Sequence, residues 1–229
     1  VGGTGLYIDS LISGLDFADN TSDNALRDKL GAEYDSLGGD AMLARLAQFD
    51  PERAAKLHPG DKRRIVRAIE IYLLTGTTIT EHDRITAARP KRYDAARIVL
   101  NYADRADLYA RIDARVDAME QAGLADEVRA LLASGLSPDC TAMQAIGYKE
   151  IAAFLEGKTT EREAFDLIKQ SSRRYAKRQL TWFGRWKDAL RIVWDKVPDM
   201  EKARHASTEF LHSRVYHNAG HPDDGCDTL

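Results

Sequence analysis

Cysteine and long apolar runs are scarce in this sequence. Its two cysteines, Cys140 and Cys226, lie far apart in the chain, which argues against a disulfide framework and fits a reducing compartment. No stretch of about 18 apolar residues is present, so no membrane span is expected. The start of the chain lacks the pattern of a secretory signal. These absences predict a cytoplasmic protein without a membrane partner.

An excess of positive charge is also lacking, because 33 Lys and Arg stand against 36 Asp and Glu, for a net charge of -3. A nucleic-acid surface would therefore need local segregation of charge. Neither the G-x-x-x-x-G-K-[ST] phosphate loop nor the G-x-G-x-x-G dinucleotide motif occurs. Metal-ligand spacing is missing too, and the tail residues His217, His221 and Cys226 are not interpreted as a metal site.

Strand-like segments are few, and most of the chain has helical periodicity. Apolar, β-branched runs predict strands at 96–102 and 190–194, and Val1 resembles the end of a third strand. A helix is expected to begin after Asp61 as its N-cap and to end at Gly76. Its predicted buried stripe consists of Ile65, Ala68, Ile69, Tyr72 and Leu73.

The chain opens on VGGTGLYI, a pattern typical of a strand end that leads through a tight glycine turn into a helix. Such turns often hold a phosphate group. A strand is expected to precede this turn in the complete fold.

A second motif is the helix start HPGDKRRIVR, where Lys62, Arg63 and Arg64 occupy the first turn. The helix dipole disfavours cations at this end, and RNA phosphates would relieve the repulsion. The alternative is a set of solvated surface charges offset by Asp61. The segment by itself favours that simpler interpretation.

The third motif, SSRRYAKRQLTWFGRWK, belongs to a helix expected to begin at a capping box of Thr160 and Glu163. No acidic residue interrupts it from Lys169 to Lys187. Its cations are Arg173, Arg174, Lys177, Arg178, Arg185 and Lys187. Interleaved aromatic rings suit unstacked RNA bases. The alternative is an amphipathic helix whose aromatics, such as Tyr175 and Phe183, are core residues, but the uninterrupted charge favours an anion-binding face.

Two weaker patterns complete the set. Asp107, Arg111 and Arg115 follow helical spacing, which favours a surface ion-pair ladder, although an arginine here could instead bind a pyrophosphate. The segment QAIGYKE contains Gly147 as a turn residue before a helix.

Read in order, VGGTGLYI, HPGDKRRIVRAIEIY, DRADLYARIDARVDAM, QAIGYKE and RRYAKRQLTWF resemble the tRNA dimethylallyltransferase family over residues 1–194. The resemblance implies an α/β fold, with a P-loop-kinase-like core whose N-terminal part is missing from this chain, and an inserted all-helical domain. The chain itself is expected to be mostly helical. The implied parts are a core remnant at 1–14, a helical insertion at 15–95, core with tRNA-binding helices at 96–200, and a C-terminal helix and tail at 201–229.

The implied activity is transfer of a dimethylallyl group from its pyrophosphate to N6 of the adenine 3′ of the anticodon. The implied partners are the tRNA anticodon stem-loop and dimethylallyl pyrophosphate, bound by a monomer. The implied cofactor is Mg²⁺, with most of its site N-terminal to the GGT block, as are the phosphate loop and the general-base aspartate.

The resemblance also assigns roles to residues. Thr4 matches the threonine at the reaction centre, and Arg115 is the candidate for a pyrophosphate contact. The implied tRNA-binding residues are Arg27, Arg63, Arg64, Arg67, Gln144, Gly147, Tyr148, Lys149, Lys177, Arg178, Gln179, Thr181 and Trp182. Gly184 and Gly60 depart from the arginine and asparagine usual in the family.

Two rival functions remain open from the sequence. One is an RNA-binding fragment without catalysis. The other is a small-molecule kinase or a prenyltransferase of free adenylate, which would not need the RNA-binding segments.

Overall fold

The computed structural model describes residues 2–14, 23–90 and 93–218, with side chains as far as residue 214. The chain divides into two compact units, which are described separately. The helical unit comprises Leu6–Asp94, and the sheet unit comprises Val1–Gly5 with Ala95–Leu229. Helix α1 (Gly5–Ser13) begins at the boundary between them.

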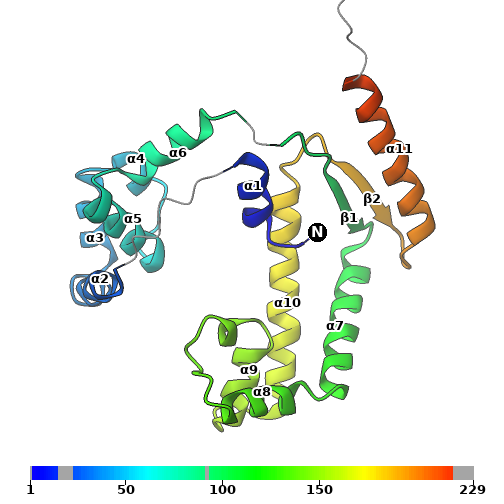
Figure 1. Ribbon diagram of the computed structural model, residues 1–229. Helices are drawn as coiled ribbons and strands as arrows, with labels where there is room; N and C mark the ends of the chain where they lie inside the picture. The colour runs from blue at the N-terminus through cyan, green and yellow to red at the C-terminus, as the bar shows by residue number, and fades with distance from the viewer. Residues whose placement is uncertain (1, 15–22, 91–92, 219–229) are drawn as a thin grey trace, which may run out of the picture. The chain divides into compact units, whose positions relative to one another are not determined.

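The described residues of the helical unit form five helices after α1 (Figure 1). They are α2 (Asn24–Leu37), α3 (Gly39–Ala47), α4 (Pro51–Ala54), α5 (Lys62–Thr75) and α6 (Ile79–Ala87). Helices α2, α3 and α5 enclose a core that contains Leu30, Met42, Leu46, Ile65, Val66, Ala68 and Ile69.

Helix α5 confirms most of its predicted pattern. Ile65, Ala68 and Ile69 are buried as expected, and Gly76 ends the helix with a left-handed φ of 71°. Leu73, however, is 49% exposed, so its predicted burial was wrong. Leu73 lies on the same side of the helix as the buried Val66, seven residues earlier, but it is in the last turn of α5, beyond Ile69, the last residue of the core. The side chain of the buried Glu70 takes part in the interior instead.

The N-cap of α5 differs from its prediction in bonding. Asp61 precedes the helix, but its side chain makes no capping hydrogen bond. Its carboxylate Oδ2 accepts the backbone N–H of His58 at 3.1 Å and closes the turn before the helix. The side chain of Asp61 therefore stabilises the turn that precedes α5, and it does not cap the helix itself.

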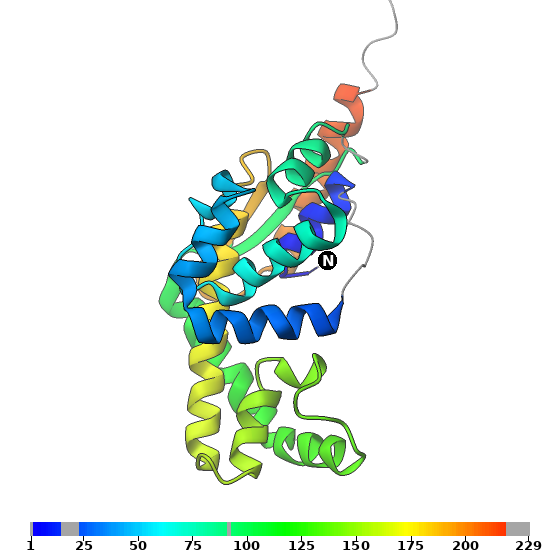
Figure 2. The same ribbon diagram turned by 90° about the vertical axis from the view of Figure 1, so that its left-hand side faces the viewer.

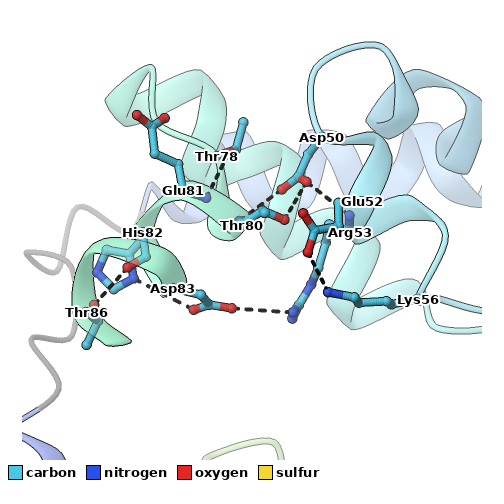
Figure 3. Close-up of polar contacts among 10 residues, drawn as sticks. All are labelled: Asp50, Glu52, Arg53, Lys56, Thr78, Thr80, Glu81, His82, Asp83 and Thr86. Carbon is cyan, nitrogen blue, oxygen red and sulfur yellow. Dashed lines mark hydrogen bonds and ion pairs between the residues drawn. The ribbon is translucent and has the colours of Figure 1, made fainter. Parts of the chain in front are cut away.

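A buried aspartate joins α4 to α6 (Figure 3). Asp50 Oδ1 accepts the backbone N–H of Arg53 at 3.0 Å and the hydroxyl of Thr80 at 2.6 Å. Its other oxygen accepts the backbone N–H of Thr80 at 3.1 Å. One carboxylate thus caps α4 and also fixes the first turn of α6.

The sheet unit contains both predicted strands. Strands β1 (Ile98–Tyr102) and β2 (Leu190–Trp194) are parallel, with Ile98 opposite Leu190. Val1, the expected end of a third strand, lies outside the described residues.

The long connection from β1 to β2 is helical. It consists of α7 (Arg105–Gln121), α8 (Leu124–Ala133), a short 3₁₀ helix η1 (Ala142–Gln144), α9 (Tyr148–Leu155) and α10 (Glu161–Phe183), and α11 (Met200–Asn218) follows β2. Helices α7 and α10 lie side by side (Figures 1 and 2). Val116 on α7 and Phe165 and Ile168 on α10 share one core. The Thr160–Glu163 capping box of α10 is present as predicted.

The architecture is mostly helical around a small parallel sheet, in agreement with the predicted α/β class. None of the helices in the described part of the chain is long and apolar enough to cross a membrane.

Candidate functional site

The GGT turn is bound to one face of α10. Gln179 Nε2 donates to the Gly3 carbonyl oxygen at 2.9 Å, and the Tyr175 hydroxyl donates to the same oxygen at 3.3 Å. The hydroxyls of Thr4 and Tyr175 are 3.1 Å apart. The basic helix therefore fixes the turn, and Tyr175 orients the exposed Thr4 hydroxyl.

The close approach of this turn requires glycine. A Cβ on Gly3 would lie 2.0 Å from Gln179 Nε2, and a Cβ on Gly5 would lie 2.1 Å from Trp182 Cδ1. Real Cβ atoms do not approach other heavy atoms this closely, so any larger residue must displace a side chain of α10. The glycines of the motif thus bring Thr4 onto the cationic helix.

The polar contact of Tyr175 revises its interpretation as a core residue. Its ring is half-buried, but its hydroxyl reaches both Gly3 and Thr4. A phenol has one proton to donate. Tyr175 therefore donates either to the Gly3 carbonyl oxygen or to Thr4. In the second case Thr4 keeps its own proton for a ligand, and in the first Thr4 donates to Tyr175.

The cations of α10 separate onto two faces. Arg173 Nη1 lies 2.5 Å from Asp113 Oδ1, and Lys169 Nζ lies 2.5 Å from Asp117 Oδ1, so both pair with carboxylates of α7. These two cations are already matched by acids. A second face presents Arg174, Lys177, Arg178 and Thr181, all of them exposed.

Aromatic rings accompany the exposed cations. The guanidinium of Arg178 lies 5.5 Å from the ring centroid of Tyr175, and that of Arg185 lies 5.1 Å from the centroid of Trp182. Of the aromatic residues in this motif, Trp186 is the buried one, and the predicted core residue Phe183 is half-buried against it. The exposed part of α10 therefore combines cations with ring faces, as the sequence predicted.

A groove in the helical unit collects the other basic motif. It has a volume of about 880 Å³ between α2 and α5. Its charged lining residues are Arg27, Asp28, Asp35, Lys62, Arg63 and Arg67. We call it the arginine groove. It brings Arg27, Arg63 and Arg67 together, although they come from two separate sequence segments.

The basic first turn of α5 is partly neutralised. Lys62 Nζ lies 2.6 Å from both carboxylate oxygens of Asp35, and Arg64 is 3.9 Å from Asp61. Arg63 is exposed and has no ion pair among the described residues. Lys62 is therefore a paired surface charge, as the simpler interpretation has it. Anion binding by Arg63 stays a prediction.

Glu70, which binds two of the groove arginines from the interior, is the residue that the sequence analysis missed. Its side chain is 0% exposed and binds two arginines. The distances are 3.2 Å from Arg27 Nε to Oε2, 3.0 Å from Arg27 Nη2 to Oε1 and 3.0 Å from Arg67 Nη1 to Oε2. A charged residue inside the apolar stripe of α5 was the available signal.

The QAIGYKE segment uses its polar groups largely within its own fold. Gly147 has a φ of 106° and its N–H donates to Glu150 Oε2 at 2.8 Å. Gln144 donates to the Pro138 carbonyl oxygen at 3.2 Å. The Tyr148 hydroxyl donates to Glu127, and this hydrogen bond, followed by burial, raises the pKa of Tyr148. Lys149, in the first turn of α9, is 48% exposed, and its Nζ lies 3.7 Å from Glu150 Oε1.

Arg115 stands apart from this arrangement. It is exposed on α7, and among the described residues no ion pair joins Asp107, Arg111 and Arg115. The favoured ion-pair ladder was therefore wrong, because the acids of α7 that form ion pairs, Asp113 and Asp117, bind α10. No hydrogen bond links Arg115 to Thr4 within the described part of the chain.

The described residues include no group of three or more His, Cys, Asp or Glu side chains placed to hold a metal ion. The Mg²⁺ implied by the family resemblance stays a prediction. The tail residues His221 and Cys226 and the side chain of His217 lie outside the described part of the chain.

The fold and these two surfaces define a helical, parallel-sheet protein with cationic faces suited to a polyanion. The model of the IPP transferase family matches residues 1–186. The chain therefore belongs to the IPP transferase family.

Curated relatives agree. A tRNA dimethylallyltransferase of Heliobacterium modesticaldum is 41% identical over 204 residues, which cover 89% of this chain and 62% of the relative. One from Symbiobacterium thermophilum is 46% identical over 211 residues, covering 92% of this chain and 64% of the relative. The chain thus spans less than two thirds of the length of these relatives.

Solved structures match as well. The tRNA isopentenylpyrophosphate transferase of Bacillus halodurans has a TM-score of 0.58 and 37% identity, and the match covers 95% of this chain and 68% of that one. A eukaryotic dimethylallyltransferase, described as acting on tRNA, has a TM-score of 0.65 and 25% identity, with 98% of this chain and 57% of that one covered. These matches agree with the predicted family and fold class.

Proposed function

We propose that this chain is part of an enzyme that transfers a dimethylallyl group from dimethylallyl pyrophosphate to N6 of the adenine 3′ of the anticodon in tRNA. The proposal is supported by family membership and by relatives that are tRNA dimethylallyltransferases. The observation that carries it is the GGT turn, which presents Thr4 beside the exposed cations and rings of α10.

In the proposed reaction, N6 attacks the allylic carbon, a C–N bond forms, and the C–O bond to pyrophosphate breaks. The exocyclic amine is a weak nucleophile, so a base must take its proton. Thr4 is proposed to donate a hydrogen bond to the departing oxygen, where negative charge develops. The family resemblance assigns the base and the phosphate loop to a segment N-terminal to the GGT block.

Binding of the RNA is the larger part of this chain's proposed role. The target adenine must leave its stack before its amine can react. Arg178, Lys177 and Trp182 on α10 are proposed to receive the splayed loop, since rings stack with bases while cations bind the backbone. Arg115 is retained as a proposed pyrophosphate contact.

The remaining expectations are also proposals. Mg²⁺ is proposed, from the family resemblance, to be held mostly by residues N-terminal to the GGT block. The protein is proposed to be a monomer in the cytoplasm, and the absence of a disulfide pattern in the sequence is consistent with a reducing compartment.

A binding titration tests the RNA-binding part of this function. The chain is titrated with an anticodon stem-loop that contains the A-A-A target, over a salt series, beside a scrambled hairpin and free AMP. We expect preference for the stem-loop and a steep salt dependence. Arg178→Ala should make the slope shallower by about one unit. Arg162→Ala, which removes an exposed cation near the start of the same helix, is the matched control and should leave the slope unchanged.

Equal affinity for the stem-loop and the scrambled hairpin would contradict a role in tRNA recognition. Preference for AMP would instead favour a small-molecule prenyltransferase.

A further inference from the structure

One buried carboxylate connects the two arginines of the arginine groove. Glu70 comes from the inner face of α5, with no solvent exposure, while Arg27 comes from α2 and Arg67 from α5. Arg27 binds it through both Nε and Nη2, which fixes the plane of its guanidinium group. Arg67 adds one bond from Nη1.

These contacts leave most of each guanidinium available. A guanidinium group has five N–H donors, of which Arg27 gives two to Glu70 and Arg67 gives one. The two side chains are 42% and 37% exposed, and both line the groove. The remaining N–H donors of Arg27 and Arg67 are therefore held in place by the buried Glu70, on side chains that are exposed to the groove.

The charge balance points to an anion as the missing partner. A buried carboxylate is neutralised by one arginine, yet Glu70 binds two, so the group of three carries a net charge of +1. The other charged lining residues balance one another, with Lys62 and Arg63 against Asp35 and Asp28, so the net charge of +1 is that of the groove as a whole. A ligand with a single phosphate charge at this point would complete the balance.

We propose that Glu70 is a positioning residue, which holds Arg27 and Arg67 together as a preorganised site for a backbone phosphate of an RNA stem. This inference rests on the proposed tRNA-binding function and deepens it. Glu70 does not touch the RNA; it acts by fixing the orientation of two groups that do.

The role of Glu70 can be separated from its charge. If only charge mattered, Glu70 would repel a phosphate, and Glu70→Gln would tighten RNA binding. If Glu70 positions the arginines, the same variant weakens binding although it makes the protein more positive. The two explanations predict opposite signs.

The test measures affinity of the 229-residue chain for the anticodon stem-loop across a salt series. We expect Glu70→Gln to weaken binding about tenfold and to make the salt slope shallower by about one unit, because one fewer phosphate is neutralised. Glu33→Gln is the matched control. Glu33 also lies on the helical unit in an ion pair, at 2.6 Å from Arg45, but neither residue lines the groove. It should leave affinity unchanged or slightly tighter.

A second pair of variants leaves the buried position intact. Arg27→Lys and Arg67→Lys keep the charge but lose the planar fork that Glu70 orients. Arg27→Lys should weaken binding nearly as much as Arg27→Ala, whereas Arg45→Lys should have no effect. In the Glu70→Gln background, Arg67→Ala should cost much less than in wild type, because the pair is already disordered.

The outcomes distinguish the role of Glu70 from the proposed tRNA-binding function. Circular dichroism at the assay temperature verifies that each variant is folded, and if Glu70→Gln is not, the lysine variants decide. Selective wild-type binding that Glu70→Gln and Arg27→Lys leave unchanged overturns the role of Glu70 alone. Wild-type binding that does not distinguish the stem-loop from the scrambled hairpin overturns the proposed function, and the role of Glu70 with it.

Discussion

Gly5→Ala should destabilise the sheet unit by forcing one methyl group into the ring of Trp182. The added Cβ would lie 2.1 to 2.4 Å from Cδ1, Nε1 and Cγ of that ring. Relief requires displacement of a half-buried indole or of the turn itself, and overpacking of this kind costs about 1–3 kcal/mol. Alanine favours helix by up to about 1 kcal/mol relative to glycine, so we expect a net loss of about 1–2 kcal/mol.

Tryptophan fluorescence during urea unfolding measures this loss selectively. The three tryptophans, Trp182, Trp186 and Trp194, all belong to the sheet unit, so their emission reports that unit and not the helical one. With a slope of about 2 kcal/mol per molar urea, a loss of about 2 kcal/mol lowers the midpoint by about 1 M. The native emission of Trp182 should also shift.

Gly2→Ala is the matched control, because a Cβ at that position meets nothing within 4 Å. It should change the midpoint little. A Gly5→Ala variant with the wild-type midpoint, emission and stem-loop affinity would refute the close packing of the GGT turn on α10.

Two further predictions concern single carboxylates. Asp50→Ala removes the acceptor of three hydrogen bonds and should destabilise the helical unit by about 1–3 kcal/mol, measured by unfolding followed by circular dichroism. A variant as stable as the wild type would contradict the role of Asp50 in holding Thr80. Hydrogen bonds from the backbone and the side chain of Thr160 lower the pKa of Glu163 below 4.5. The ionised Glu163 therefore stabilises the folded protein fully above pH 4.5, and this stabilisation is lost as the pH falls through the pKa of Glu163 in the folded state. Thermal unfolding measured over a series of pH values checks this, and Glu163→Gln should lack the acid-dependent loss of stability. If the variant and the wild type have the same dependence of unfolding temperature on pH, the ionised Glu163 contributes nothing to stability.

Local signals were sufficient for much of the fold. The two strands, the capping box of α10 and the glycine stop of α5 depend on neighbours within a few residues. Errors arose at the two ends of α5, where the helix pattern no longer decides the environment. Leu73 lies in the last turn, beyond the buried core, and Asp61 binds the backbone of His58 in place of the helix N-terminus.

The side chains that hold the candidate site residues in place could not be predicted. The family resemblance implies roles for Arg27 and Thr4, yet it does not say what holds them. Glu70 is 43 residues from Arg27, and Tyr175 is 171 residues from Thr4. No helical or strand period links such positions, so only the folded chain reveals that a buried acid and a tyrosine orient these groups.

The arrangement of acids explains how a chain of net charge -3 presents cationic surfaces. Between Lys169 and Lys187, α10 has no acid of its own, and the acids that reach it come from α7 on one side. They bind Lys169 and Arg173, which are four residues apart and share a face. Arg174 lies one residue beyond Arg173, about 100° around the helix, and Arg178 lies five residues beyond it, about 140° around, where α7 supplies no partner among the described residues. Neutralising one face thus fixes the helix in place and leaves the adjacent face positive, so the position of the acids, and not their number, decides which face can receive the proposed RNA.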